Sequence, residues 1–258
     1  MEEAFAIEVA PGQLVWTAVH AGHELRAGLV DVVALDPSTR LREEDPFTDR
    51  MLGDCGIRVI VHRSRFEVDL NRPREQAVYR GPDESFGLEV WKRELSPGEL
   101  EWSRRIHDDF YTCLSTHLDR LATNGRFLVL DVHSYNHRRG GPDAHPEPAD
   151  GNPEVNVGTA AIEGRGWDHA VATFVEALGD QEVRDHRLDV RVNVRFQGGY
   201  LCRWVAERYP ETACPLAIEF KKVFMDEWTG QCDDKHVREL RQALGVAART
   251  VDELTDVV

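Results

Sequence analysis

Basic residues are scarce in this sequence. Its 31 Lys and Arg residues stand against 46 Asp and Glu residues, so the formal net charge at pH 7 is −15. A chain of this charge is repelled by the phosphate backbone of nucleic acids and by anionic membranes, and neither is expected as its partner. A small anionic ligand remains compatible with it, because a few cations inside a pocket can oppose the overall field.

Long apolar runs and cysteine are also in short supply. No run approaches the roughly 18 to 20 apolar residues that span a bilayer, and the start, Met1-Glu2-Glu3, lacks the basic and apolar regions of a signal peptide. The five cysteines are odd in number and form no C-x-x-C pair. These absences predict a cytoplasmic protein with reduced thiols and no disulfide framework.

Two common catalytic or cofactor motifs are missing as well. The sequence contains no G-x-S-x-G, the turn that presents a serine nucleophile, and no glycine-rich loop with dinucleotide or P-loop spacing. Serine-based hydrolysis and nucleotide binding are therefore not expected.

What the sequence does contain is a regular alternation of strands and helices. Apolar or alternating runs predict strands at 14–19, 58–61, 127–132, 188–196 and 215–220. Helical spacing of apolar residues predicts helices at 97–124, 167–178 and 233–244, and one between Gly199 and Pro210. The turn-rich segments 36–56 and 137–166 are predicted to be long, mostly irregular loops. The alternation predicts one domain over residues 1–258, with a three-layer α/β fold and a mixed, largely parallel sheet.

The helix at 97–124 has the clearest ends. Ser96 is a suitable N-cap, Pro97 suits the first helical position, and Glu99 completes a capping box. Gly125 supplies the left-handed stop.

Histidines follow two of the predicted strands. His20 comes after the first strand, with His23 and Glu24 in the turn beyond it, and His133 comes after the strand at 127–132. Ligands of α/β proteins bind beyond the carboxyl ends of strands, and catalytic Zn²⁺ takes three N or O ligands and keeps one position open. The sequence therefore predicts one Zn²⁺ ion held by His20, His133 and either His23 or Glu24. The alternative is that one of these histidines is structural.

Two aspartates in the loop at 36–56 are weaker candidates. Asp45 and Asp49 could orient a histidine ligand, bind the metal directly, or cap a helix.

Glu219 is a carboxylate inside the apolar strand at 215–220. Burying an unpaired charge is costly, so this side chain must face a partner, a metal or a pocket. Beside an activated water it would serve as a general base, since burial raises a carboxylate pKa toward neutral pH. The alternative is a salt bridge to Lys221, Lys222 or a core arginine.

Several arginines and one asparagine are candidates for binding a substrate carboxylate. Arg65, Asn71 and Arg72 lie in one polar segment, and Arg138 lies in the basic run after His133. Guanidinium groups bind carboxylates through two parallel hydrogen bonds. A solvated, salt-bridged loop is the competing interpretation of both segments.

Taken together, these segments resemble the N-formylglutamate amidohydrolase family. The resemblance spans about residues 15 to 230 and rests on Val19-His20-Ala21-Gly22, Ser64-Arg65-Phe66-Glu67-Val68-Asp69-Leu70-Asn71-Arg72, Asp131-Val132-His133-Ser134, Gly198-Gly199-Tyr200 and Ala217-Ile218-Glu219-Phe220-Lys221. It implies a phosphorylase/hydrolase-like fold, related to zinc carboxypeptidases and aspartoacylases. It also implies a zinc-dependent hydrolase that cleaves an N-acyl amino acid such as N-formylglutamate.

The resemblance implies a role for each matching residue. His20 and His133 would bind zinc, and the second ligand of the related His-x-x-Glu motif falls on His23, with Glu24 one residue later. Glu219 would be the catalytic glutamate. Substrate binding would fall to Asn71 and Arg72, with Arg65 upstream. A carboxypeptidase or isopeptidase acting on a peptide end, and a non-catalytic carboxylate-binding module, are the rival functions.

Overall fold

The structure is a computed structural model that describes residues 3–255. Its centre is a mixed seven-stranded sheet within these residues. In spatial order the strands are β1 (Phe5–Val9), β3 (Ile57–Val61), β2 (Leu14–Ala18), β4 (Phe127–Tyr135), β9 (Ala213–Lys221), β5 (Val155–Gly158) and β8 (Val190–Val192). Strands β3, β2, β4 and β9 run parallel to one another. Strand β1 pairs antiparallel with β3, and β5 pairs antiparallel with β9.

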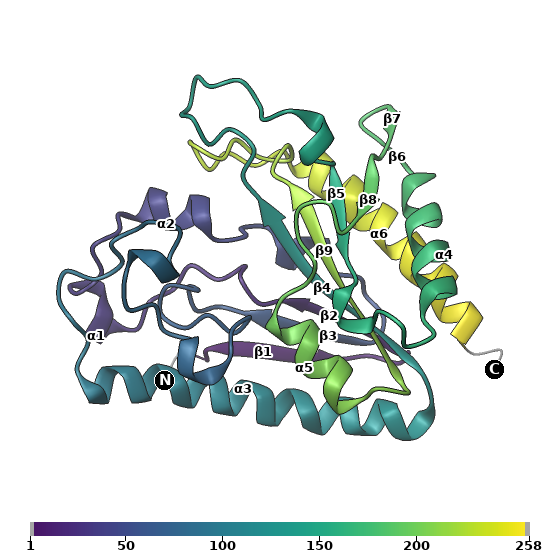
Figure 1. Cartoon of the computed structure of the whole chain (residues 1–258), viewed down its shortest axis with the longest axis horizontal. Coiled ribbons are helices and arrows are strands. Elements are labelled where there is room, and N and C mark those ends of the chain that lie inside the picture. Colours follow the sequence, from purple (N-terminus) through teal and green to yellow (C-terminus); the bar gives the residue numbers. More distant parts are fainter. Residues whose placement is uncertain (1–2, 256–258) are drawn as a thin grey trace.

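Helices cover both faces of the sheet (Figure 1). On one face lie α3 (Pro97–Asn124) and α5 (Tyr200–Arg208), whose apolar residues pack with Val15 of β2 and Val129 of β4. On the other lie α4 (Asp168–Gly179) and α6 (Asp234–Thr255), which pack with the alternate residues Trp16 and Leu130. Successive side chains of a strand point to opposite faces, so each parallel strand contributes to two cores. The predicted three-layer α/β fold is confirmed.

Smaller elements complete the chain. They are α1 (Ala27–Val30), α2 (Pro37–Glu43), the hairpin of β6 (Glu182–Val183) and β7 (His186–Arg187), and 3-10 turns at Thr48–Met51, Arg74–Gln76, Pro82–Glu84, Ala149–Gly151 and Ala160–Ile162. All five cysteines are free, as predicted. Among the described residues, no helix combines the length and the apolarity needed to cross a membrane.

The ends of α3 are as predicted. The Ser96 side chain accepts from the backbone of Glu99, and the Glu99 side chain accepts from the backbone of Ser96, so the capping box is formed. The helix ends at Asn124, and Gly125 follows with a φ of 132°.

Two strand predictions were wrong in extent, and two strands of the sheet, β1 and β5, were not predicted. The segment 137–166 is mostly irregular, as predicted, but it contains β5, which is paired with both β9 and β8. Its four residues are too few for a periodic signal, and the pairing stabilises them. The strand at 188–196 shortens to β8, because Asn193 adopts a left-handed φ of 54°. Strand β4 extends to Tyr135, so His133 lies within it.

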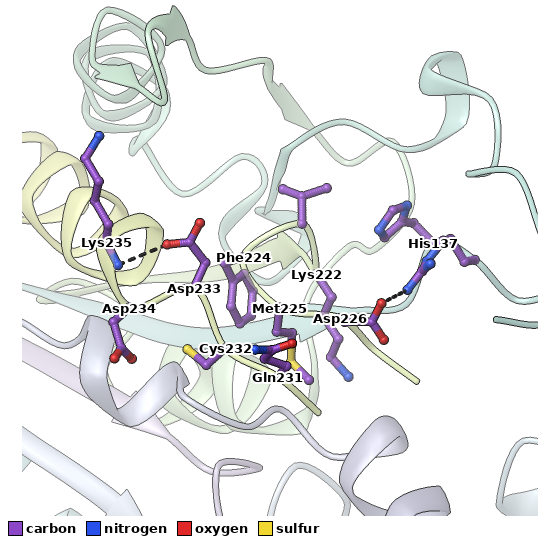
Figure 2. A pocket seen from close by; sticks show the side chains of 12 residues that line it. His137, Lys222, Phe224, Met225, Asp226, Gln231, Cys232, Asp233, Asp234 and Lys235 are labelled. Carbon is purple, nitrogen blue, oxygen red and sulfur yellow. Dashed lines mark hydrogen bonds and ion pairs between the residues drawn. The ribbon is translucent and has the colours of Figure 1, made fainter. Parts of the chain in front are cut away.

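The carboxyl ends of the parallel strands meet at one edge of the sheet. Strand β2 leads there to His20, β4 carries His133, and β9 carries Glu219. Beside this edge, the loop between β9 and α6 forms one wall of an open groove of about 760 Å³ (Figure 2).

Candidate metal centre and active site

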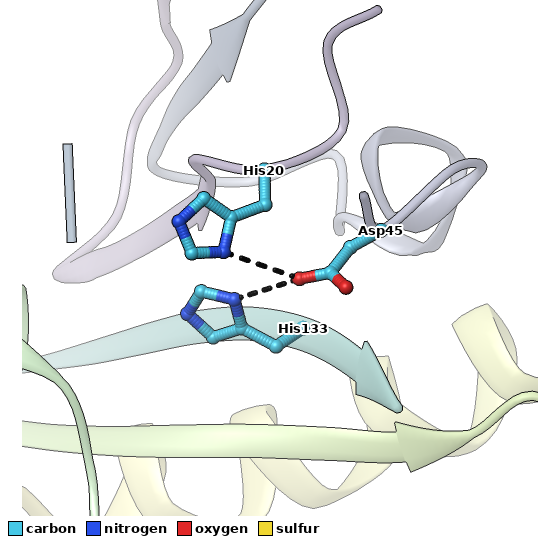
Figure 3. A group of neighbouring side chains, drawn as sticks. All are labelled: His20, Asp45 and His133. Carbon is cyan, nitrogen blue, oxygen red and sulfur yellow. Dashed lines mark hydrogen bonds and ion pairs between the residues drawn. The ribbon is translucent and has the colours of Figure 1, made fainter. Parts of the chain in front are cut away.

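Two histidines and one aspartate converge at this edge (Figure 3). The Nδ1 atoms of His20 and His133 lie 3.4 Å and 3.0 Å from the same oxygen, Oδ2 of Asp45. All three side chains are buried, and potential ligand atoms, one from each, lie within 4.8 Å of one another. Two imidazoles and a carboxylate are a typical donor set for a catalytic zinc ion, which takes three protein ligands and an open position. The donors therefore fit one divalent metal ion of this kind.

Each histidine has a second carboxylate against its other ring nitrogen. Nε2 of His20 lies 2.7 Å from Oδ1 of Asp69, and Nε2 of His133 lies 2.8 Å from Oδ2 of Asp131. Such carboxylates fix the orientation of metal-binding histidines and increase their basicity. Thr17 in turn donates to Asp131 over 2.6 Å. Both rings are thus oriented so that their Nδ1 atoms face Asp45.

The charges of this cluster oppose the effect of burial. Burial lowers the pKa of His133, but the opposing effect of Asp131 and Asp45 is larger, so the pKa lies well above its ordinary value. Burial raises the pKa of Asp69, but His20 and Arg65 bring it well below the usual range. Such a set of ionised carboxylates around two imidazoles suits a divalent cation, whose charge would balance theirs.

The structure does not bring His23 or Glu24 to this cluster, contrary to the expectation for the second ligand. Nδ1 of His23 lies 2.5 Å from Oε2 of Glu44, and the Glu24 side chain is 54% exposed beside Arg63. The turn at Gly22 is the reason. A Cβ there would lie 2.3 Å from the backbone of His62, so only glycine lets the chain pass this close. The following residues then run along the end of β3, with the Glu24 amide donating to the carbonyl of His62 over 3.0 Å.

Asp45 takes the place beside the histidines. The N-cap of helix α2 is Asp36, whose side chain accepts from the amides of Ser38 and Thr39. The helix ends at Glu43, two residues before Asp45. The amide of Asp45 then donates to the carbonyl of His20 over 2.9 Å. Asp45 thus contacts both histidines, as either a metal ligand or a carboxylate that orients them would. Asp49 lies in the 3-10 turn that follows.

Glu219 lies beside the cluster. It is paired in register with His133, on the neighbouring parallel strand. Burial raises its pKa to about 7, with His133 acting in the opposite direction. The lysines considered as salt-bridge partners are bound elsewhere: Lys221 donates to the carbonyl of Asn152, and Lys222 to two other carbonyls. Glu219 therefore faces a polar cavity without a lysine partner.

That cavity has a volume of about 270 Å³. Its wall contains the metal-binding candidates and Glu219, with Glu43, Arg65, Asn71, Phe86, Ser134, Tyr135, Asn136, Arg139, Phe196, Gln197, Gly198, Gly199 and Lys222. Of the four predicted substrate-binding residues, Arg65 and Asn71 line it. Arg65 is held by the hydroxyl of Tyr79 and by Asp69. Asn71 accepts from the amide of Leu201 over 2.9 Å.

Gly199, the second residue of the glycine pair, is explained by the position of Asn71. A Cβ on Gly199 would lie 2.2 Å from the Asn71 amide group, so this glycine gives the asparagine its place in the wall. The side-chain nitrogen of Asn71, Nδ2, lies 3.2 Å from Nε2 of His133.

The other two predicted substrate-binding residues lie outside the cavity wall. Arg72 stacks on the ring of Tyr79 and donates to the carbonyl of Glu84. Arg138 forms an ion pair of 2.7 Å with Asp226. Its neighbour Arg139 lines the cavity instead, with an ion pair of 3.8 Å to Glu147.

Sequence reasoning gave no site role to Asp131 or Lys222. Asp131 could have been found, because it lies two residues before His133 in a strand and so shares its face. Lys222 could not, since only the fold tells it apart from the adjacent Lys221. The basic run after His133 was a candidate for the pocket wall, and the fold selects Arg139 from it and not Arg138.

Comparisons with known proteins agree with this architecture. The family model for N-formylglutamate amidohydrolase matches residues 12–225, a range that contains the whole cavity wall. The crystal structure of N-formylglutamate amidohydrolase from Ralstonia eutropha JMP134 is 16% identical with a TM-score of 0.73, and the match covers 98% of each chain. A gene product from Agrobacterium tumefaciens is 15% identical with a TM-score of 0.70, over 98% of this chain and 96% of that one.

No curated protein sequence matches the chain significantly. At such identities the two crystal structures show a shared fold, whereas the family model covers most of the sequence itself. The chain therefore belongs to the N-formylglutamate amidohydrolase family.

Proposed function

We propose that the protein is a zinc-dependent hydrolase that cleaves the amide bond of an N-acyl amino acid such as N-formylglutamate. The observation that carries the proposal is the convergence of His20, Asp45 and His133 beside Glu219 in one small cavity. These three residues would hold the ion. A bound Zn²⁺ supplies Lewis acidity, which polarises a carbonyl group and lowers the pKa of water from about 15.7 to about 7.

Glu219 is the general base in this proposal. It takes the proton from the attacking water and delivers it to the nitrogen of the leaving amine, so the amide bond breaks and a carboxylic acid and an amine are formed. Its pKa of about 7 suits both steps, because the group can accept and release a proton near neutral pH.

Two arginines in the cavity wall support an anionic substrate. The Arg65 guanidinium is already held by Tyr79 and Asp69, so it offers a fixed direction to one substrate carboxylate, with Asn71 nearby. Arg139 has a 54% exposed side chain and a long ion pair, so it is free to turn toward a second anionic group. This arrangement fits an acyl derivative of an acidic amino acid.

The size of the cavity favours this substrate class over a peptide end. About 270 Å³ is near the lower limit for small-molecule sites and matches a compound of a dozen or so heavy atoms. A cavity of this size holds one acyl amino acid more readily than several residues of a peptide.

The test combines metal analysis with a substrate panel. Purified protein should contain close to one zinc per chain and hydrolyse N-formylglutamate faster than N-acetylglutamate or peptidyl-glutamate. A chelator should abolish the activity, and added Zn²⁺ should restore it. Full activity in protein freed of metal would contradict the proposal, and preference for a peptidyl substrate would contradict the assigned substrate class.

A further inference from the structure

Lys222 is a buried cation that the proposed chemistry does not use. It follows β9 directly, and its side chain separates the cavity from the open groove, since it lines both. Figure 2 shows it in the groove wall, next to the turn that carries Met225 and Asp226. The residue is only 1% exposed. Burying an ammonium group is costly unless its charge and its donors are satisfied.

Backbone carbonyls, and not a carboxylate, satisfy this ammonium group. Its Nζ donates to the carbonyl of Arg42 over 2.5 Å and to the carbonyl of Glu44 over 2.7 Å. Among residues 3–252, whose side chains the structure describes, no carboxylate forms an ion pair with it. The chain therefore places a costly charge where it contacts one short backbone segment.

That segment leads directly to Asp45. Arg42 lies in the last turn of α2, where carbonyls have no partner inside the helix and where a cation interacts favourably with the helix dipole. Glu44 is the residue after the helix, with an extended backbone. Both carbonyls are thus fixed within three residues of the aspartate that contacts the two histidines.

Lys222 is itself held by the strands that carry the other site residues. Its amide donates to the carbonyl of Tyr135, at the end of β4, over 3.0 Å. It therefore links the ends of β4 and β9, which carry His133 and Glu219, to the loop that carries Asp45. The donor and its acceptors are 178 and 180 residues apart in the chain, so the link exists only in the folded protein.

We infer that Lys222 is a positioning residue for the metal centre, which holds the Arg42–Glu44 backbone so that the Asp45 carboxylate meets both histidines. The inference rests on the proposed metal site. It assigns the lysine no contact with substrate and no proton transfer. Replacing Lys222 should therefore change the geometry of the metal site and weaken its affinity for the metal.

The experiment compares Lys222→Met with Lys221→Met as a matched control. The two lysines are adjacent, but Lys221 donates to the carbonyl of Asn152, away from the Asp45 loop. Zinc affinity is measured by competition with a chromophoric chelator, and the visible spectrum of the Co²⁺-substituted protein reports the ligand geometry. We expect Lys222→Met to bind zinc about 10- to 100-fold more weakly with a changed Co²⁺ spectrum, as for other residues that orient metal ligands. Lys221→Met should match the wild type in both.

Each further outcome decides the matter. Wild-type zinc affinity and an unchanged Co²⁺ spectrum in Lys222→Met would overturn the role of Lys222 alone, as would an equal loss in Lys221→Met. If Lys222→Met does not fold, Lys222→Gln, whose side-chain nitrogen is one bond nearer the backbone and so cannot reach both carbonyls as Nζ does, is measured in the same way. Weaker binding by that variant supports the role and wild-type binding overturns it. A wild-type protein that binds no zinc would overturn the metal site and this inference together.

Discussion

Oδ2 of Asp131 lies 2.8 Å from Nε2 of His133, and Asp131 precedes His133 by two residues on the same face of β4. The pair resembles the carboxylate–histidine arrangements that orient metal ligands. On the opposite side of the ring, Nδ1 is left to face Asp45. The strand thus delivers both the candidate ligand and the group that orients it.

Asp131→Asn should weaken zinc binding about 10- to 100-fold, because the amide keeps the shape of the side chain but loses its charge. Competition with a chelator measures the effect. Thr17→Val is the control, since it removes the hydrogen bond to the other Asp131 oxygen and leaves the carboxylate beside His133. A larger loss in Thr17→Val than in Asp131→Asn would contradict the assigned role.

Alanine variants should show whether Asp45, and not His23 or Glu24, is the third residue needed for zinc binding. Asp45→Ala is expected to lose stoichiometric zinc, because it removes one of three converging donors. His23→Ala and Glu24→Ala should retain one zinc per chain, since neither side chain reaches the cluster. Metal analysis after gel filtration gives the answer, and zinc loss in His23→Ala with retention in Asp45→Ala would reverse the assignment.

Glu219→Gln should lower kcat by about 10²- to 10⁴-fold, which is the usual contribution of a general base. Zinc content should not change, because the residue is not among the converging donors. Both quantities are measured on the same preparation. A variant with wild-type kcat would exclude Glu219 as the base.

The pH dependence of kcat should show an acidic limb. Burial raises the pKa of Glu219 to about 7, and a base must be unprotonated to act, so activity is present above this pKa and is lost as the pH falls through it. A nearby cation favours the ionised carboxylate, so the midpoint should lie at or below pH 7. Initial rates from pH 4 to 9 at saturating substrate test this, and a rate that rises toward acid would contradict it.

Arg139→Gln should selectively impair substrates with a second carboxylate. We expect kcat/KM for N-formylglutamate to fall about tenfold or more, with little change for N-formylglutamine, because only the acidic substrate loses an ion pair. Arg138→Gln is the matched control, since Arg138 is paired with Asp226 outside the cavity wall. An unchanged ratio of the two substrates in Arg139→Gln would exclude the contact.

Local patterns in the sequence determined a large part of this molecule. The helix at 97–124 was predictable with both ends, because Ser96, Glu99 and Gly125 act on backbone groups within a few residues of themselves. The apolar strands that deliver His20, His133 and Glu219 to one edge were predictable for the same reason. The alternation of strands and helices can be recognised from short segments of sequence. In a parallel sheet the carboxyl ends of the strands lie at the same edge, so the residues that follow them meet there.

Only the tertiary structure decided which neighbours of these residues join the site. Asp45 reaches the histidines and His23 does not, because the amide of Asp45 bonds the carbonyl of His20 while the chain after Gly22 follows the end of β3. The choices of Arg139 over Arg138 and of Lys222 over Lys221 have the same origin. In each case adjacent residues of one type differ only in the partners that the fold brings to them from distant parts of the chain, and such contacts leave no periodic trace in the sequence.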